Sequence, residues 1–328
     1  MTPLLSVHGL RVHFATRSGA LRAVDGLSFE VNAGETVAIV GESGCGKSAT
    51  ALSLLRLLDE PPAKIAGSVA FNGRNLLDLG ETEMRKIRGD QIGMVFQEPM
   101  TSLNPLLTIG RQLIEPIALH RGVAPRAARA RAVELLKLVG IASPERRMSE
   151  YPHHLSGGMR QRVMIAIAIA CNPKLLIADE PTTALDVTIQ AQILDLLRDL
   201  QVKIGSAIIL ITHDLGVVAE LAQRVIVMYA GQKVEEASVA GIFDSPNHPY
   251  TRGLLGAIPK LGSSIDEQAD SRLTEIPGAV PSLIAPRIGC SFVNRCAYAQ
   301  ELCHRVAPAL RPVAVDHVSA CHFAATLC

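Results

Sequence analysis

Short apolar runs alternate with helical patterns through the middle of the chain. Four runs are continuous and apolar and indicate strands, namely residues 36–40, 175–178, 207–212 and 225–229. Such runs are typical of parallel strands that are buried on both faces. Between them, residues 187–200 follow a helical repeat whose apolar face holds Ile189, Ile193, Leu197 and Leu200. Strands that alternate with helices in this way predict an α/β fold with a doubly wound sheet.

Two other stretches break this alternation. Residues from about 100 to 160 lack strong strand runs and carry a helical pattern at 126–140, which predicts a helical insertion. After Ser245 the composition shifts towards Pro, Gly and Cys, and polar residues 263–271 resemble a linker. We therefore expect a core domain at 1–245 that contains the insertion, followed by a smaller C-terminal region at 246–328.

Composition and charge narrow the possible environments and partners. The 328 residues include 48% hydrophobic residues, and 32 Lys and Arg face 31 Asp and Glu, so the net charge of +1 predicts no nucleic-acid partner. The most apolar segment, 163–171, has nine residues, whereas a bilayer span takes about 20. The N-terminus does not resemble a signal peptide. We expect a cytosolic chain without a membrane span, in which disulfides are disfavoured.

A phosphate-binding motif follows the first of the buried strand runs. The stretch GESGCGKS at 41–48 fits the pattern G-x-x-x-x-G-K-[ST]. Its glycines let backbone N–H groups turn towards phosphate oxygens, Lys47 would reach the β- and γ-phosphates, and the Ser48 hydroxyl would bind Mg²⁺. A chance glycine-rich turn would not explain why strand, loop and helix occur in order. The predicted nucleotide-binding residues are Gly41, Ser43, Gly44, Cys45, Gly46, Lys47, Ser48 and Ala49.

A pair of carboxylates ends the second buried run, LLIADE. Where a strand runs into a loop, both side chains can point at the nucleotide, with Asp179 towards Mg²⁺ and Glu180 towards an attacking water. A solvated acidic turn is the alternative for these residues taken alone. Together with the phosphate loop, they indicate nucleotide hydrolysis.

Four further motifs lie in the order found in one family. They are the Gln97 loop in VFQEP, the signature LSGGM at 155–159, Asp186 in TTALD and His213 in ITHD. With them the chain resembles the ATP-binding subunits of ABC transporters, which implies a P-loop NTPase core of RecA-like, ABC type with a helical subdomain.

The resemblance assigns roles to these residues. Ser156, Gly157 and Gly158 open a helix, and the resemblance implies that this anion site completes the ATP pocket of the opposing subunit. It also implies that Gln97 joins Ser48 and Asp179 at Mg²⁺, that Asp186 contacts the nucleotide site, and that Lys47, Glu180 and His213 act in catalysis. Because the chain has one phosphate loop and one signature, two complete pockets need a second ATPase subunit.

Two positions depart from the family pattern. The fifth signature residue is Met159, where Gln is common. The aromatic residue that stacks on adenine is usually a tyrosine, and Phe14 is the nearest candidate. Phe14 could equally be a core residue.

Longer stretches resemble the dipeptide/oligopeptide importer branch of the family. They are residues 96–105, 151–190 and 247–255. This resemblance implies import of di- or oligopeptides at the cytoplasmic face of the bacterial inner membrane, with a sister ATPase, two membrane-spanning permease subunits and an extracytoplasmic peptide-binding protein. Importers of nickel, glutathione or heme precursors are alternatives that the ATPase sequence does not separate. The turn His248-Pro249-Tyr250 is interpreted as structural.

ABC ATPases that work outside transport fit less well. DNA-repair types insert long coiled coils between the Gln loop and the signature, but here Gln97 and Ser156 are 59 positions apart. Translation factors usually carry two phosphate loops in one chain.

Cysteines gather near the C-terminus, at positions 290, 296, 303, 321 and 328. They lack the short C-x₂₋₄-C pairs that are usual in zinc sites, whereas a 4Fe-4S cluster accepts longer spacings. The importers that the chain resembles carry a similar pattern. We expect a 4Fe-4S cluster on Cys290, Cys296, Cys303 and Cys321, with Cys328 spare, and keep zinc or unrelated free thiols as alternatives. Cys45 lies in the phosphate loop, and Cys171, in an apolar helix, is expected to be a small buried residue.

Overall fold

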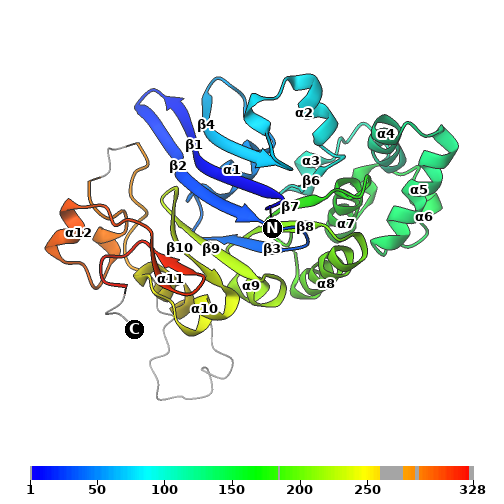
Figure 1. Ribbon diagram of the computed structural model, residues 1–328. Coiled ribbons are helices and arrows are strands. Elements are labelled where there is room, and N and C mark those ends of the chain that lie inside the picture. The colour runs from blue at the N-terminus through cyan, green and yellow to red at the C-terminus, as the bar shows by residue number, and fades with distance from the viewer. Residues whose placement is uncertain (1, 184, 259–275, 285–287, 325–328) are drawn as a thin grey trace, which may run out of the picture. The chain divides into compact units, whose positions relative to one another are not determined.

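The structure is a computed structural model that describes residues 2–183, 185–258, 276–284 and 288–324 (Figure 1). The chain forms two compact units. The first comprises Met1–Leu5, Val31–Thr36 and Phe71–Ile211, and the second comprises Ser6–Glu30, Val37–Ala70 and Thr212–Cys328. The linker expected at 263–271 lies outside the described residues.

Three parallel strands form the sheet of the first unit. They are β6 (Ile92–Val95), β7 (Leu175–Asp179) and β8 (Ala207–Thr212), with β7 in the middle (Figure 1). Every residue of these strands is buried, which is why the sequence shows continuous apolar runs without alternation. The strands expected at 175–178 and 207–212 are confirmed. The four-residue β6 was not predicted.

Helices account for most of the rest of the first unit. Residues 96–174 contain no strand, as the sequence predicted for 100–160. The helices are α2 (Glu81–Ile87), α3 (Pro99–Ser102), α4 (Ile109–Arg121), α5 (Pro125–Leu138), α6 (Pro144–Arg147), α7 (Gly157–Ala168) and α8 (Val187–Ile204). The helix α7 contacts α3, α4 and α5. A two-residue strand β5 (Arg74–Asn75) precedes α2.

Helix α8 confirms the face that the sequence pattern predicted. Ile193, Leu197 and Leu200 are buried and Ile189 is half-buried, whereas Asp195 is exposed. The helix begins after the Asp186 cap and ends at Gly205, which adopts a left-handed conformation with φ 72°. A glycine at this position ends a helix without the steric cost that a Cβ brings.

The second unit contains a mixed sheet. Strand β3 (Thr36–Val40) runs parallel to β9 (Arg224–Tyr229), which confirms two predicted strands. Beyond β9 the pairing becomes antiparallel through β10 (Gln232–Ser238), β12 (His317–Ser319) and β11 (Arg311–Ala314). The expectation of a doubly wound sheet was therefore incomplete, because three strands at this edge are antiparallel.

Another group of strands was not predicted at all. β1 (Leu5–Thr16), β2 (Gly19–Val31) and β4 (Ala63–Phe71) lie next to one another in the order β2-β1-β4. Buried and exposed positions are mixed along them, so they lack the apolar runs that revealed the parallel strands.

The second unit also contains short helices, and its sheet is extended by the C-terminal strands β11 and β12. The helices are α1 (Lys47–Leu54), α9 (Leu215–Leu221), α10 (Val239–Asp244), α11 (Pro249–Gly256) and α12 (Glu301–Arg305). The hydrophobic core beneath them includes Tyr229, Tyr250 and Phe292. No helix in the described part of the chain is both long and apolar enough to cross a membrane.

Candidate nucleotide-binding site

The phosphate loop between β3 and α1 needs glycine at two positions. Gly41 has φ 151° and Gly46 has φ 101°. A Cβ atom on Gly41 would lie 2.2 Å from the carbonyl oxygen of Met228, and one on Gly46 would lie 2.2 Å from that of Ala23. Neither backbone atom can give way, so the tight loop requires both glycines.

Lys47 is buried at the first position of α1. Its side-chain Nζ donates hydrogen bonds to the carbonyl oxygens of Gly41 at 2.7 Å and Glu42 at 3.0 Å. The ammonium therefore lies over the loop. Ser43 and Gly44 are exposed at the loop tip, Cys45 is buried, and Ser48 and Ala49 are half-buried in the first turn of the helix.

Glu42 anchors the loop to the C-terminal part of the same unit. Its backbone N–H donates to the Tyr250 hydroxyl at 2.8 Å, and its carboxylate accepts two hydrogen bonds from Arg295, at 2.6 and 2.9 Å. None of these three residues was predicted to act at the loop, because Glu42 fills an unspecified position of the motif and Tyr250 was interpreted as part of a turn. No signal in the single sequence pairs position 42 with position 295.

In the first unit, Gln97 and Glu180 come together. Glu180 Oε2 accepts hydrogen bonds from Gln97 Nε2 at 3.1 Å and from the Thr183 hydroxyl at 2.8 Å. Glu180 adopts the left-handed region with φ 45°, directly after the buried Asp179 that ends β7. Thr183 was not predicted, although it lies three residues after Glu180 in the sequence.

The signature residues begin helix α7, as predicted. The Ser156 hydroxyl caps the helix and accepts a hydrogen bond from the Met159 N–H at 3.4 Å. Ser156 and Gly157 are exposed and Gly158 is half-buried, so the first turn of the helix is open to a ligand. The Gln161 amide donates to the Pro181 carbonyl at 2.6 Å, which connects this helix to the turn after Glu180.

The remaining predicted residues have simpler settings. Asp186 caps α8 by accepting from the Ile189 N–H at 2.9 Å. His213 is exposed, between the end of β8 and the Asp214 cap of α9. Phe14 is half-buried on β1. The nucleotide roles of all three stay predictions.

The four cysteines expected to act as ligands line one small pocket. Cys290, Cys296, Cys303 and Cys321 share it with mainly apolar and aromatic side chains, including Phe292, Tyr298 and Phe323. Burial raises the pKa of Cys290 to about 11 and also raises the pKa values of Cys296 and Cys321. Opposing this, the backbone N–H groups of Phe292, Tyr298 and Phe323 lower these three pKa values through hydrogen bonds to the thiols.

No single-ion site is formed within the described residues, since no three His, Cys, Asp or Glu side chains are grouped to hold one metal ion. Cys328 lies outside those residues. The buried position expected for Cys171 is confirmed.

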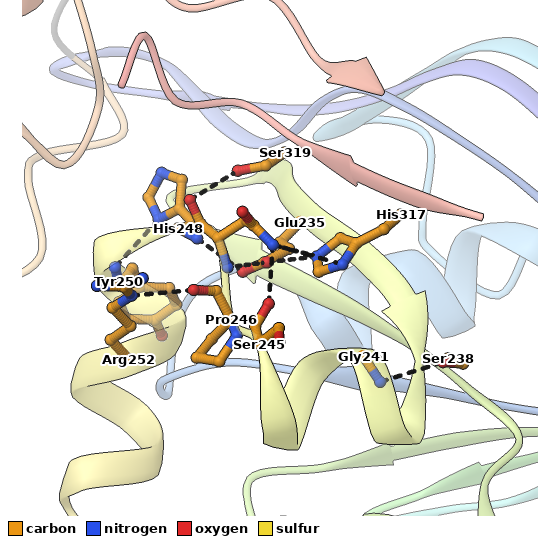
Figure 2. Close-up of polar contacts among 11 residues, drawn as sticks. Glu235, Ser238, Gly241, Ser245, Pro246, His248, Tyr250, Arg252, His317 and Ser319 are labelled. Atoms are coloured by element: carbon orange, nitrogen blue, oxygen red, sulfur yellow. Dashed lines mark hydrogen bonds and ion pairs between the residues drawn. The ribbon is translucent and has the colours of Figure 1, made fainter. Parts of the chain in front are cut away.

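A buried glutamate organises the segment that leads to Tyr250 (Figure 2). Glu235 on β10 accepts hydrogen bonds from the backbone N–H groups of Asn247 at 2.5 Å and His248 at 3.1 Å, and contacts His317 Nε2 at 2.7 Å. His248 then caps α11 by accepting from the Tyr250 N–H at 3.1 Å (Figure 2). The structural interpretation of the His248-Pro249-Tyr250 turn is therefore right for His248 but incomplete for Tyr250.

Comparisons with known proteins give matches over most of the chain. The ABC transporter family model matches residues 24–183, and the model for the C-terminal region of oligopeptide/dipeptide transporters matches 234–303. The chain is 55% identical over 319 residues to the probable peptide ABC transporter ATP-binding protein y4tR of Sinorhizobium fredii, covering 97% of this chain and 94% of that protein. It is 52% identical over 318 residues to the oligopeptide transport ATP-binding protein OppD of Bacillus subtilis, covering 97% and 88%.

Solved structures agree on the fold. The dimeric ATP-binding cassette MJ0796 in a post-hydrolysis state with ADP and Pi is 32% identical, with a TM-score of 0.65. The match covers 72% of this chain and 98% of that one.

Proposed function

The chain belongs to the ATP-binding proteins of peptide ABC transporters, and on that premise we propose how its residues bind and hydrolyse ATP. It has the ATP-binding cassette fold, and it hydrolyses ATP to power the import of peptides. The observation that carries the residue assignments is the phosphate loop, which requires glycine at positions 41 and 46 and places buried Lys47 at the start of α1.

The loop binds the phosphates of ATP. Its backbone N–H groups and the positive end of α1 attract phosphate oxygens, and Lys47 exchanges its contacts with the Gly41 and Glu42 carbonyls for the β- and γ-phosphates. The hydroxyl of Ser48, the amide of Gln97 and the carboxylate of Asp179 are oxygen donors of the kind that suits Mg²⁺. When bound, Mg²⁺ neutralises charge on the phosphates.

Glu180 serves as the general base. Gln97 and Thr183 hold one of its carboxylate oxygens, which orients the group towards an attacking water. His213, which is exposed directly after β8, contacts the γ-phosphate and stabilises the charge that develops on it.

Two such subunits share two sites. The exposed start of α7, with Ser156, Gly157 and Gly158, completes the pocket of a partner whose own signature completes the pocket at Lys47. The partner is a sister ATPase, and two ATP molecules close the pair until hydrolysis lets it reopen. The dimeric structure of the related cassette MJ0796 supports this arrangement.

The remaining partners follow from the transporter type. Two permease subunits span the membrane, an extracytoplasmic protein delivers peptide, and this chain lies at the cytoplasmic face of the bacterial inner membrane. The ATP-binding domain spans 1–245 and the C-terminal region 246–328. Di- or oligopeptides are the cargo, with nickel, glutathione or heme precursors as alternatives for a related importer.

The cysteine pocket holds a 4Fe-4S cluster in this proposal, with zinc as the alternative. Four cysteine thiols line the one pocket, and four cysteine ligands are what such a cluster takes. Backbone N–H groups directed at sulfur, as at Cys290, Cys296 and Cys321, stabilise thiolates at such clusters. The cluster would cross-link residues 290–321 and take no part in hydrolysis.

ATPase rates of the isolated chain and of the assembled transporter test the shared site. The chain has one phosphate loop and one signature, which complete each other only across a dimer. The purified chain should therefore be a poor ATPase at concentrations where it does not dimerise. Lys47→Ala should lose most of its nucleotide affinity, because it removes the cation that faces the phosphates. A monomer that hydrolyses ATP as fast as the complex contradicts the shared pocket, and parental affinity in Lys47→Ala contradicts the loop assignment.

A further inference from the structure

Arg295 is buried, and in the sequence it lies between Cys290 and Cys296, two of the cysteines that line the pocket. It ends a 3-10 turn (Val293–Arg295) directly before Cys296, and its side chain is 4% exposed. Its guanidinium donates to the carbonyls of Pro277 at 2.8 Å and Ile276 at 3.1 Å, to the Tyr229 hydroxyl at 3.5 Å, and to both carboxylate oxygens of Glu42. Such a bidentate, partly buried ion pair holds both side chains in one geometry.

Glu42 has each of its polar groups held at the phosphate loop. The N–H donates to Tyr250, the carbonyl accepts from Lys47, and the carboxylate is paired with Arg295. Glu42 follows Gly41 directly, and the loop contains two more glycines at 44 and 46. Because glycine-rich segments lose much conformational entropy when they become ordered, an anchor present before ATP arrives lowers the cost of binding.

Aromatic packing supports the same anchor. The ring centroids of Tyr229 and Tyr250 lie 4.6 Å apart, and Phe292 meets Tyr229 edge to face at 5.1 Å and Tyr250 at 5.5 Å. Phe292 is also the residue whose N–H acts on the Cys290 thiol. The cysteine pocket and the phosphate loop therefore share one rigid set of side chains within the second unit.

We propose that Arg295 and Tyr250 are positioning residues that preorganise the phosphate loop through Glu42, so that the cysteine-bearing segment sets the affinity for ATP. This inference rests on the proposed binding of ATP at the loop. A purely structural role for Arg295 would affect the stability of the C-terminal segment and leave nucleotide affinity unchanged once the chain is folded.

A double-mutant cycle on nucleotide affinity separates the two roles. The full-length chain is titrated with a fluorescent ATP analogue and Mg²⁺, using Arg295→Met, Glu42→Gln and the double variant. Each single change should weaken affinity about tenfold, because it breaks the bidentate contact that holds the Glu42 side chain in place. The double variant should weaken it by about the same factor, since both changes remove one interaction.

Two further variants sharpen the result. Tyr250→Phe removes only the hydroxyl and should weaken affinity about threefold, because the Glu42 N–H loses its acceptor. Arg224→Met is the matched control, since Arg224 forms a partly buried ion pair with Glu236 in the same unit and pairs with Val37, at the end of β3 away from the loop. It should bind the analogue like the parent. In the assembled transporter, the turnover of the positioning variants at saturating ATP should stay within about twofold of the parent.

Several outcomes would overturn the inference. Parental affinity in folded Arg295→Met, independent effects that multiply in the double variant, or an equal loss in Arg224→Met would each do so. If Arg295→Met does not fold, Tyr250→Phe decides the matter, because parental affinity in that variant overturns the proposal and weakened affinity supports it. Lys47→Ala shows whether the proposed function fails as well. If this variant loses nucleotide affinity, ATP still binds at the loop as proposed, and only the positioning role of Arg295 and Tyr250 is wrong.

Discussion

In the proposed function, individual side chains at the end of β7 carry the chemistry of hydrolysis. Asp179 is buried, and Glu180 directly after it is held by Gln97 and Thr183. Two adjacent carboxylates thus have different environments, which suits one to metal binding and the other to proton transfer.

Replacing Glu180 by Gln should stop turnover and leave ATP binding intact. The amide keeps the shape of the side chain but is a poor proton acceptor, so we expect hydrolysis to fall by about 100-fold or more. Single-turnover hydrolysis and nucleotide affinity of the assembled transporter measure the two effects. Glu134→Gln, at an exposed site on α5, is the control. Turnover within a few-fold of the parent would show that Glu180 is not the base.

His248 makes stability depend on pH. Burial lowers its pKa to about 3, against an ordinary value of about 6.5. Between these values the unfolded chain takes up a proton at His248 and the folded chain does not. Stability from this group is therefore present above pH 6.5 and falls as pH decreases, by about 1 kcal/mol per unit below pH 6.

Urea unfolding of parent and His248→Asn between pH 7.5 and 5.5 measures this effect. Asparagine can still accept from the Tyr250 N–H two residues on but does not titrate. The variant should lose less stability on acidification than the parent. Equal slopes would show that His248 is not the group responsible.

The residues of the site were only partly predictable from the sequence. Lys47, Asp179 and Glu180 belong to motifs with fixed spacing. Tyr250 and Arg295 act on Glu42 through contacts that span more than 200 residues, so a single sequence contains no local sign of them.

Among the elements, helix α7 has a structural cap that the proposed function also makes a binding surface. Ser156 caps its first turn, and Gln161 one turn later fixes the backbone after Glu180. The same helix can therefore present an anion site to a partner and stay in register with the acids of its own unit.

Ser156→Ala should impair hydrolysis at the partner's phosphate loop and spare ATP binding at Lys47. Loss of the cap also destabilises the chain by about 1 kcal/mol. Thr108→Ala is the matched control, because Thr108 caps α4 in the same unit in the same way. Comparing site-specific hydrolysis in complexes that carry either change isolates the anion site. Equal loss of activity in both variants would reduce Ser156 to a structural cap.

The elements that the sequence revealed are those buried on both faces. β3, β7, β8 and β9 form continuous apolar runs, and the parallel sheet could be predicted from them. Strands β1, β2 and β4 contain exposed as well as buried positions, so they form no continuous apolar run. Strand β12 has only three residues, which is too short for a pattern to be recognised.

For the molecule as a whole, the C-terminal region combines the cysteines of the proposed cluster with side chains that contact the phosphate loop. Four cysteines that are spread over 32 residues of sequence gather around one pocket. Residues beside these cysteines in the sequence contact the phosphate loop or its anchor: Arg295 pairs with Glu42, and Phe292 packs against Tyr250.

Anaerobically purified protein should contain about four irons per chain and absorb near 400 nm, as the proposed cluster requires. Cys290→Ala should lose the iron. Cys171→Ala, which removes a buried thiol outside the pocket, should keep it. If the parent contained one zinc and no iron per chain, the cluster proposal would be wrong and the cysteines would hold a single zinc ion.

ATP hydrolysis by the complete transporter, reconstituted in vesicles with its permease subunits, sister ATPase and peptide-binding protein, measures the function most directly. Adding a di- or oligopeptide should raise the rate in the parent, and Glu180→Gln should abolish the increase. A rate that no peptide changes, but that nickel, glutathione or a heme precursor raises, would contradict peptide import by this chain.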